Sequence, residues 1–362
     1  MQNQSPKHSA PKQHSRIRRI IVWTLVALVA IIGLGGAYVA YQTKSSIDHT
    51  YSAAHGANRA KVSNSKPVSI LLMGTDTGAL GRTDKGRTDT IMVVTINPKT
   101  KKATMVSIPR DTLVKIDGTN DTEKINAAYT VGGASTSMKT VEKLVGVPMN
   151  YYVLINMGGL EKVVNAIGGI EVNVPFSWSD SHTHMSFTKG KAHLNGKQAL
   201  AFSRMRYEDP KGDYGRQQRQ QQVIQQVVKK VTKSGNVAMY QKLLSLLSSN
   251  MKTNLSFNDM ISLAEHDKDS VKHVKKSSLQ GIGAYINDAA YQVPATKTLQ
   301  NTSDLLRTSL GESKKPLNNF NVQQNKLNTK NGFDWNSGNN PVYTVYDNNS
   351  ASNNANTIQT NN

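Results

Sequence analysis

The stretch Thr90–Ile108 reads TIMVVTINPKTKKATMVSI and holds two apolar runs on either side of the polar segment Asn97–Thr100. Short runs rich in β-branched residues, divided by an Asn-Pro turn, predict two buried strands joined as a hairpin. A third run of this kind, Val68–Met73, precedes them and ends at Gly74. Together the three runs predict the centre of a buried β-sheet.

Strand-like and helix-like patterns alternate in the sequence that follows. Tyr151–Ile155 and Ile170–Val174 are further strand candidates. Helical spacing of apolar residues occurs in five segments, which are Ala134–Val145, Gly159–Ile167, Asn195–Ser203, Asp213–Thr232 and Val237–Leu247. This alternation predicts an α/β fold, an α-β-α sandwich around a central mixed β-sheet.

The N-terminal segment predicts a membrane anchor. Residues 1–19 contain five basic residues and no acidic residue, and residues 20–43 contain no charge. A helix of about 20 apolar residues crosses a bilayer, and the basic flank places the N-terminus in the cytoplasm. A cleaved signal peptide is the alternative, but the apolar segment is longer than a usual signal-peptide core. We therefore expect a single-pass protein of the cell membrane, with the rest of the chain extracellular.

These patterns divide the chain into five parts. They are a cytoplasmic basic tail at 1–19, a transmembrane helix at 20–43, an extracellular stalk at 44–66, an extracellular folded domain at 67–310 and an Asn-rich tail at 311–362. Ten of the last 27 residues are Asn, and Asp347 is the only charge among them. Because such a composition buries no apolar core, the tail is predicted to be disordered.

Composition excludes several classes of function. Only 37% of the residues are hydrophobic, which excludes a multi-span membrane protein. The 44 basic residues outnumber the 24 acidic ones, and the net charge of +20 predicts attraction to polyanions. The chain has no cysteine, so disulfides, thiolate nucleophiles and Cys-ligated zinc are excluded.

Two acids and an arginine are predicted at one end of the sheet. In a hairpin, Asp89 at the start of one strand and Arg110 after the end of the next lie at the same edge. Asp76 joins them if the first strand runs antiparallel to the second. Paired carboxylates can bind a hard cation such as Mg²⁺, and an arginine suits the phosphate oxygens that the cation contacts. The alternative is that both aspartates only stabilise turns.

Arginine is concentrated in three short segments, although lysine is the commoner base. The chain has 32 Lys and 12 Arg. Seven of the arginines are Arg82, Arg87 and Arg110 near the strands, Arg204 and Arg206, and Arg216 and Arg219. Because arginine binds phosphate through two parallel hydrogen bonds and lysine does not, this distribution predicts phosphate recognition.

Local geometry groups some of these arginines. If Ser203–Tyr207 is extended, Arg204 and Arg206 lie on one side of it. In the predicted helix Asp213–Thr232, Arg216 and Gln220 continue the stripe of valines, with Asp213 at the N-cap. A helix N-terminus also favours a phosphate group.

Six segments resemble, in the same order, the motifs of the LytR-CpsA-Psr family of Gram-positive cell-wall enzymes. They are Gly74–Asp76, Gly86–Thr90, Ser107–Asp111, Lys124–Tyr129, Leu200–Arg206 and Asp213–Gln220. The resemblance implies a metal-assisted phosphotransferase. Such an enzyme moves an anionic glycopolymer, either wall teichoic acid or a capsular or secreted polysaccharide, from undecaprenyl pyrophosphate to a peptidoglycan sugar hydroxyl. The chain departs from the family pattern at Gly78, where arginine is usual, and at Thr88, where serine is common.

The resemblance also implies roles for single residues. Asp76, Asp89 and Arg110 are the expected catalytic residues, and both aspartates would bind Mg²⁺, with Mn²⁺ as the alternative. The expected pyrophosphate-binding residues are Arg87, Arg110, Arg204, Arg206, Asp213, Arg216 and Gln220. Asp89 is the first candidate for the general base and Asp111 the second. The prenyl chain needs an apolar slot, which the helices at Val223–Val231 and Val237–Leu247 can line, although core packing explains those residues equally well.

The expected partners are undecaprenyl-pyrophosphate-linked glycopolymer, peptidoglycan and membrane lipid, but no nucleic acid. One rival function is a polyprenyl-pyrophosphate hydrolase, in which water is the acceptor. A second is a membrane-anchored regulator of envelope genes, which the topology opposes because residues 1–19 are too few for a helix-turn-helix. His182, His184 and His193 lack a further ligand at a recognised spacing, so we expect a surface loop there instead of a zinc site.

Overall fold

The computed structural model describes residues 66–76, 86–234, 250–255, 274–338 and 340–346. The predicted cytoplasmic tail, the transmembrane helix at 20–43 and almost all of the stalk lie outside these ranges. The helix predicted at Val237–Leu247 and the arginine Arg82 also lie outside them. Within the described ranges, no helix is both long enough and apolar enough to cross a membrane.

A mixed six-stranded sheet forms the centre of the fold, in the order β11-β6-β1-β2-β3-β12. β1 runs antiparallel to β2 and parallel to β6, and β12 runs parallel to β3. The strands are β1 Val68–Thr75, β2 Thr88–Asn97, β3 Lys102–Ser107, β6 Tyr151–Asn156, β11 Met251–Thr253 and β12 Val274–Ser278. The predicted α/β class, the central mixed sheet and the three central strands are confirmed.

The apolar runs of the central strands do not alternate with polar residues, because a hydrophobic core covers each face of the sheet. Along β1, Ile70 and Leu72 pack into one hydrophobic core, while Leu71 and Met73 pack into the other. The predicted turn between β2 and β3 is also present. Asn97 Oδ1 accepts hydrogen bonds from the backbone N–H groups of Lys99 and Thr100, at 3.1 and 3.2 Å.

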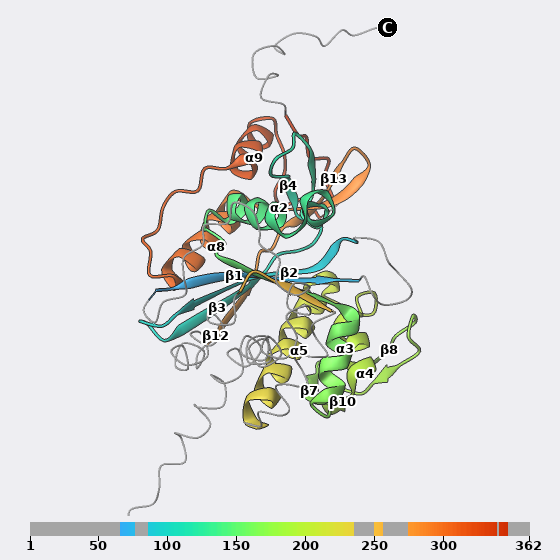
Figure 1. The fold of residues 1–362 in the computed structure, drawn as a ribbon. Helices are drawn as coiled ribbons and strands as arrows, with labels where there is room; N and C mark the ends of the chain where they lie inside the picture. The colour runs from blue at the N-terminus through green and yellow to red at the C-terminus, as the bar shows by residue number, and fades with distance from the viewer. Residues whose placement is uncertain (1–65, 77–85, 235–249, 256–273, 339, 347–362) are drawn as a thin grey trace, which may run out of the picture.

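Helices lie on both faces of the sheet (Figure 1). α3, α4 and α5 cover one face, and α2, α8 and α9 lie on the other. The helices are α2 Ala127–Val145, α3 Met157–Ala166, α4 Gly196–Arg204, α5 Gly212–Ser234, α8 Thr296–Ser309 and α9 Phe320–Lys330. α2 begins earlier than its apolar pattern indicated, because its first residues precede a kink at Gly133, whose φ is 71°.

Four small two-stranded sheets complete the fold. Two of them, β4–β5 and β13–β14, lie on the side of α2, and the other two lie on the side of α5 (Figure 1). Their strands are β4 Leu113–Lys115, β5 Thr122–Lys124, β13 Ile282–Ile286, β14 Ala289–Val293, β7 Ile170–Val174, β10 Gly190–Leu194, β8 Trp178–Ser179 and β9 Ser186–Phe187. β7 has the bounds that the sequence predicted.

The C-terminal segment corrects the prediction of a disordered tail from residue 311. Helix α9 and residues 340–346 are folded, and Val322 and Tyr343 are buried. The buried face of α9 is rich in amide side chains that hydrogen-bond to backbone carbonyl groups. The Nδ2 groups of Asn321, Asn325 and Asn328 donate to the carbonyl oxygens of Leu113, Pro294 and Thr344, at 2.7, 3.0 and 2.7 Å. The segment therefore docks through hydrogen bonds that a count of apolar residues misses, while residues 347–362 lie outside the described ranges.

Asn325→Leu tests this docking. The substitution removes the hydrogen bonds of Asn325 to Pro294 and to the Tyr343 hydroxyl, and buried polar groups left without partners cost about 1–3 kcal/mol each. We expect the free energy of unfolding in urea to fall by at least about 1 kcal/mol. The matched control is Gln323→Leu on the exposed face of the same helix. Equal stabilities of the two variants would contradict the docked arrangement.

Candidate active site

Three strand ends bring the predicted carboxylates and arginine to one edge of the sheet. Thr75 at the end of β1 pairs with Thr88 at the start of β2, which places Asp76 and Asp89 at this edge. β3 ends at Ser107, and Ile108 N–H still donates to Ile91 O at 2.8 Å, so Arg110 follows at the same edge. The predicted hairpin and the antiparallel pairing of the first two strands are confirmed.

Asp89 and Arg110 form the central pair of the site. Arg110 Nη1 donates to Asp89 Oδ1 at 2.6 Å, and both side chains are about one quarter exposed. Burial alone would lower the pKa of Arg110, but the hydrogen bond to Asp89 and the charges of Asp111 and Asp213 outweigh it and raise the pKa. The guanidinium group therefore keeps its positive charge at any physiological pH.

The first turn of α5 adds a second acid–arginine pair. Asp213 forms an ion pair with Arg216 and accepts a hydrogen bond from Gln217 Nε2 at 2.9 Å. Since α5 begins at Gly212, Asp213 lies inside the first turn, and its prediction as the N-cap is wrong. Its negative charge is still favourable there, because the helix dipole is positive at this end.

Arg216 is buried beside two other arginines. Burial is the main cause that lowers its pKa, and the positive charges of Arg110 and Arg206 lower it further. The carboxylates of Asp213 and Asp89 act in the opposite direction. The structure thus brings Arg110 and Arg206 close enough to Arg216 to act on its charge, and Asp213 and Asp89 oppose their effect. We call these five residues the arginine cluster.

The arginine cluster has hydrogen-bonding capacity that the protein does not use. The Nε atoms of Arg110 and Arg216 are buried and have no hydrogen-bond partner within the described part of the chain. Arg110 Nε lies 3.7 Å from Asp111 Oδ2, which is an ion-pair distance but too long for a hydrogen bond. Concentrated positive charge with unused donors is what a polyanionic group such as pyrophosphate requires.

Arg204 and Arg206 do not lie on one extended segment, so that prediction is wrong. Helix α4 begins with a capping box formed by Asn195 and Gln198, continues through Arg204 and has Met205 as its C-cap. Arg204 lines a groove, whereas Arg206 belongs to the arginine cluster and its guanidinium lies 5.4 Å from the ring centroid of Tyr207. The two arginines therefore belong to different local structures, Arg204 to the last turn of a helix and Arg206 to the segment after it.

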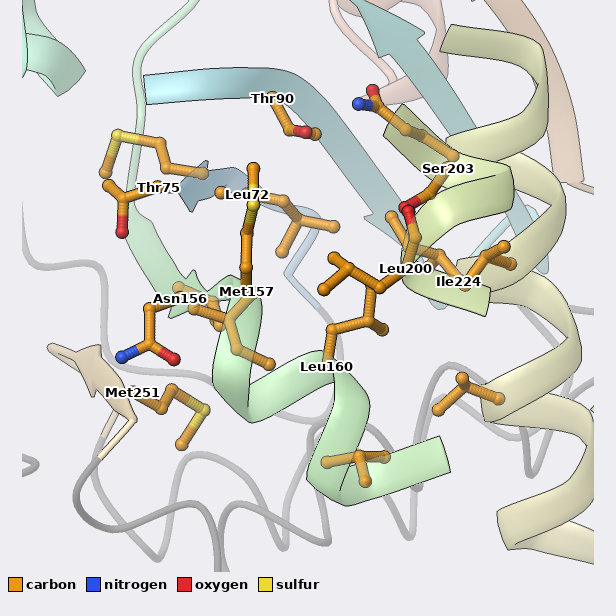
Figure 2. Close-up of a pocket in the computed structure, with 18 of the residues that line it drawn as sticks. Leu72, Thr75, Thr90, Asn156, Met157, Leu160, Leu200, Ser203, Ile224 and Met251 are labelled. Carbon is orange, nitrogen blue, oxygen red and sulfur yellow. The ribbon is translucent and has the colours of Figure 1, made fainter. Parts of the chain in front are cut away.

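This groove opens between the sheet and helices α3, α4 and α5 (Figure 2). The empty space between its walls is about 1060 Å³, a volume that includes the part open to solvent. Most of its lining is apolar and comes from β1, β6 and the three helices, as with Leu72, Met157 and Leu160. Val223 and Val227 of the predicted slot also line it. The polar lining residues are Thr75, Thr90, Asn156, Ser203, Arg204 and Gln220.

Arg87 and Arg219 lie apart from this group. Arg87 is half exposed and pairs with Glu123 at 3.7 Å, beside β5. Arg219 is buried, forms an ion pair with Asp209 and stacks over Trp178 and Phe202, so it holds α5 against the α4 region. Spacing along the helix does not show which of Arg216 and Arg219 is available to a ligand and which packs into the core, because both positions are buried.

The hairpin β13–β14 hydrogen-bonds to two segments of the site. The sequence did not predict this contact. The Tyr214 hydroxyl donates to Gln292 Oε1 at 3.0 Å and accepts from Gly281 N–H at 2.8 Å. Gln292 N–H in turn donates to Asp111 O at 2.9 Å. One residue of the hairpin therefore fixes both the first turn of α5 and the segment that carries Arg110.

His182 and His184 lie where a surface loop was expected, whereas His193 lies on a strand. His182 and His184 are exposed between β8 and β9, and His193 on β10 pairs with Glu171 at 2.6 Å. Among the residues that the structure describes, no group of three or more His, Asp or Glu side chains is arranged to hold a metal ion. Any cation at the sheet edge would therefore depend on the two aspartates together with ligand oxygens.

The family model of LytR_cpsA_psr matches residues 36–308. The chain belongs to the LytR-CpsA-Psr family. It is 44% identical over 288 residues to a polyisoprenyl-teichoic acid–peptidoglycan teichoic acid transferase, TagU, of Enterococcus faecalis, a match that covers 79% of this chain and 94% of that protein.

Solved structures of the LytR-CpsA-Psr type have the same fold. The crystal structure of B. subtilis TagU is 38% identical, with a TM-score of 0.55, and the match covers 69% of this chain and all of that one. A structure of TagT bound to LIIa-WTA is 31% identical, with a TM-score of 0.59, over 72% of this chain and 99% of that one.

Glutamine substitutions at Arg216 and Arg219 should have different effects, the first mainly on pyrophosphate affinity and the second mainly on the free energy of unfolding. Arg219→Gln leaves the buried Asp209 carboxylate without its cation, and breaking such a pair costs about 3–5 kcal/mol of unfolding free energy. Arg216→Gln also leaves Asp213 without its cation, but Asp213 is more exposed than Asp209 and the substitution removes a charge that Arg110 and Arg206 repel, so the loss of stability should be smaller, while affinity for pyrophosphate falls. Urea unfolding and calorimetric titration measure both effects. The assignment fails if Arg216→Gln is the more destabilised variant or binds pyrophosphate normally.

Proposed function

We propose that this family member is a phosphotransferase that moves an anionic glycopolymer from a polyprenyl-pyrophosphate carrier to a sugar hydroxyl of peptidoglycan. The observation that carries the proposal is an apolar groove whose polar lining includes Gln220, one helical turn from Arg216 of the arginine cluster. A groove of this kind suits a ligand with a long apolar chain and a compact, multiply charged headgroup. A prenyl pyrophosphate combines these two properties.

The groove and the arginine cluster meet at the first turns of α5. Arg216 belongs to the cluster, and Gln220, one helical turn later, lines the groove with Arg204. In this arrangement the prenyl chain occupies the apolar groove, and the pyrophosphate lies against Arg110, Arg206 and Arg216. The relatives named as teichoic acid transferases support teichoic acid as the polymer.

The sheet edge fits a hard divalent cation. Asp76 and Asp89 offer only carboxylate oxygens, the ligands that Mg²⁺ prefers, and phosphate oxygens and water would complete its coordination. When bound, Mg²⁺ neutralises charge on the phosphate oxygens. Mn²⁺ accepts the same donors. Arg110 keeps Asp89 in place through the 2.6 Å hydrogen bond.

The residues of the cluster then serve the transfer step. The acceptor hydroxyl oxygen bonds to the phosphorus that carries the glycopolymer, the phosphoanhydride bond breaks, and its electron pair leaves with the prenyl phosphate. The hydroxyl proton passes to a carboxylate at the sheet edge, for which Asp89 is the first candidate and Asp111 the second. Arg110, Arg206 and Arg216 stabilise the negative charge that shifts toward the leaving phosphate.

The direct test is incubation of the full-length protein in detergent with Mg²⁺, a synthetic prenyl-pyrophosphate glycan and peptidoglycan oligomers. Mass spectrometry should detect a phosphodiester-linked product and prenyl phosphate in equal amounts. Release of prenyl phosphate that does not depend on the oligomers would instead support a pyrophosphate hydrolase. Absence of both products would refute the proposed function.

Asp89→Asn should abolish most turnover, because it removes one of the two carboxylates at the proposed cation site and the charge that offsets Arg110. The Mg²⁺ concentration that gives half-maximal turnover should rise in any residual activity. Asp213→Asn is the matched control, since this carboxylate lies on α5 and not at the strand ends, so its Mg²⁺ midpoint should match wild type. An Asp89→Asn protein with normal turnover would remove Asp89 from both the metal and the base roles.

We also propose that the domain is extracellular and anchored by a helix at residues 20–43, as the basic, then uncharged, N-terminal sequence indicates. This location places the enzyme beside both substrates. Protease added to intact protoplasts should degrade the domain while the membrane-embedded segment survives. Protection of a C-terminal epitope would contradict this topology.

A further inference from the structure

A second hollow lies on the opposite face of the sheet from the apolar groove that we propose for the prenyl chain. The groove belongs to the face that α3, α4 and α5 cover, whereas this hollow lies beside α2 and the β4–β5 hairpin (Figure 1). Its lining residues are Arg87, Ile116, Asp121, Glu123, Ala127, Thr130 and Val131. Arg87 precedes Thr88 and Asp89 directly, so the hollow begins at the sheet edge that carries the site.

The chemistry of phosphoryl transfer favours this position for the acceptor. The attacking and leaving oxygens lie roughly in line on opposite sides of the phosphorus. If the leaving prenyl phosphate belongs to the groove on one face of the sheet, the attacking hydroxyl must approach from the other side. The hollow lined by Arg87 lies on that face of the sheet, and Asp89 follows Arg87 by two residues at the sheet edge.

We propose that this hollow, which we call the acceptor hollow, binds the sugar unit of the acceptor glycan, an inference that rests on the proposed transferase function. Its lining combines the groups that a sugar ring requires. The carboxylates of Asp121 and Glu123 can accept hydrogen bonds from sugar hydroxyl or amide N–H groups. Val131 is 50% exposed, and it can pack on the C–H groups of the ring or on an N-acetyl methyl group.

Several interactions hold the rim of the acceptor hollow in place. Thr130 Oγ1 donates to Gly86 O at 2.9 Å and so fixes the start of α2 to the residue before Arg87. Glu123 pairs with Arg87 at 3.7 Å and accepts from the Tyr291 hydroxyl at 3.2 Å. A rim that is held before the glycan arrives loses less conformational freedom on binding.

Ion pairs link the rim of the acceptor hollow to the segment that carries Arg110. Lys124 Nζ lies 3.4 Å from Asp111 Oδ1, and Asp111 Oδ2 lies 3.7 Å from Arg110 Nε. Since Glu123 lines the acceptor hollow and the next residue, Lys124, pairs with Asp111, a sugar in the hollow would lie near the segment that carries Asp111, the second candidate to accept the hydroxyl proton. Bond formation and proton transfer would then occur on one side of the phosphorus and release of prenyl phosphate on the other.

Val131→Trp fills the acceptor hollow and tests the inference. With a fixed prenyl-pyrophosphate glycan and soluble peptidoglycan oligomers, we expect the KM for the oligomer to rise roughly tenfold or more, a loss of at least about 1.4 kcal/mol. Loss of uniform binding raises KM with little change in kcat, whereas distortion of the transfer site would lower kcat. The matched control is Val342→Trp, which changes another exposed valine that does not line the hollow and should keep the wild-type KM.

Asp121→Asn provides a second variant that changes no volume. It should raise the KM for the oligomer several-fold and leave the KM for the prenyl donor at its wild-type value, because Asp121 lies on the acceptor side. Wild-type oligomer KM values in both Val131→Trp and Asp121→Asn would overturn the inference. Failure of the wild-type protein to transfer at all would instead refute the proposed function, so the two failures are distinguishable.

Discussion

The hydrogen-bonded ion pair between Asp89 and Arg110 is the interaction on which the site depends. It connects the start of β2 to the segment after β3, and Arg110 in turn lies near Asp111 and Asp213. Three arginines cannot share a partly buried region without negative charges between them, since the low dielectric strengthens their repulsion. The aspartates make the arginine cluster compatible with folding, and the excess positive charge remains for a ligand.

The sheet separates two chemical environments that a lipid-linked substrate needs. One face carries an apolar groove under three helices, and the other carries polar loops and the acceptor hollow. Only the strand ends are common to both, and the arginine cluster lies there. This division explains why the functional residues come from many short segments, each at the end of a strand or helix, as in other α/β proteins.

Sequence reasoning predicted the parts of the fold where apolar pattern and secondary structure agree. β1, β2 and β3 are buried on both faces, so their runs of apolar residues were unambiguous. β12 was missed because it is an edge strand whose sequence, Val274–Ser278, is mostly Lys and Ser. In the site, residue types drew attention to the arginines, but spacing could not show that Arg87 lies apart from the cluster, that Arg204 ends a helix or that Arg219 holds the fold. Those distinctions depend on long-range partners such as Asp209 and Phe202.

The amide-rich inner face of α9 has a consequence for how the C-terminal segment behaves when it opens locally. Most helices that detach from a domain expose a stripe of methyl groups, which invites aggregation. α9 would expose mainly Asn and Gln, which water solvates well, together with the buried Val322 and the half-buried Phe320 and Leu327. Brief opening of this segment therefore carries little risk of misassociation between neighbouring copies, even where many copies are crowded on one surface.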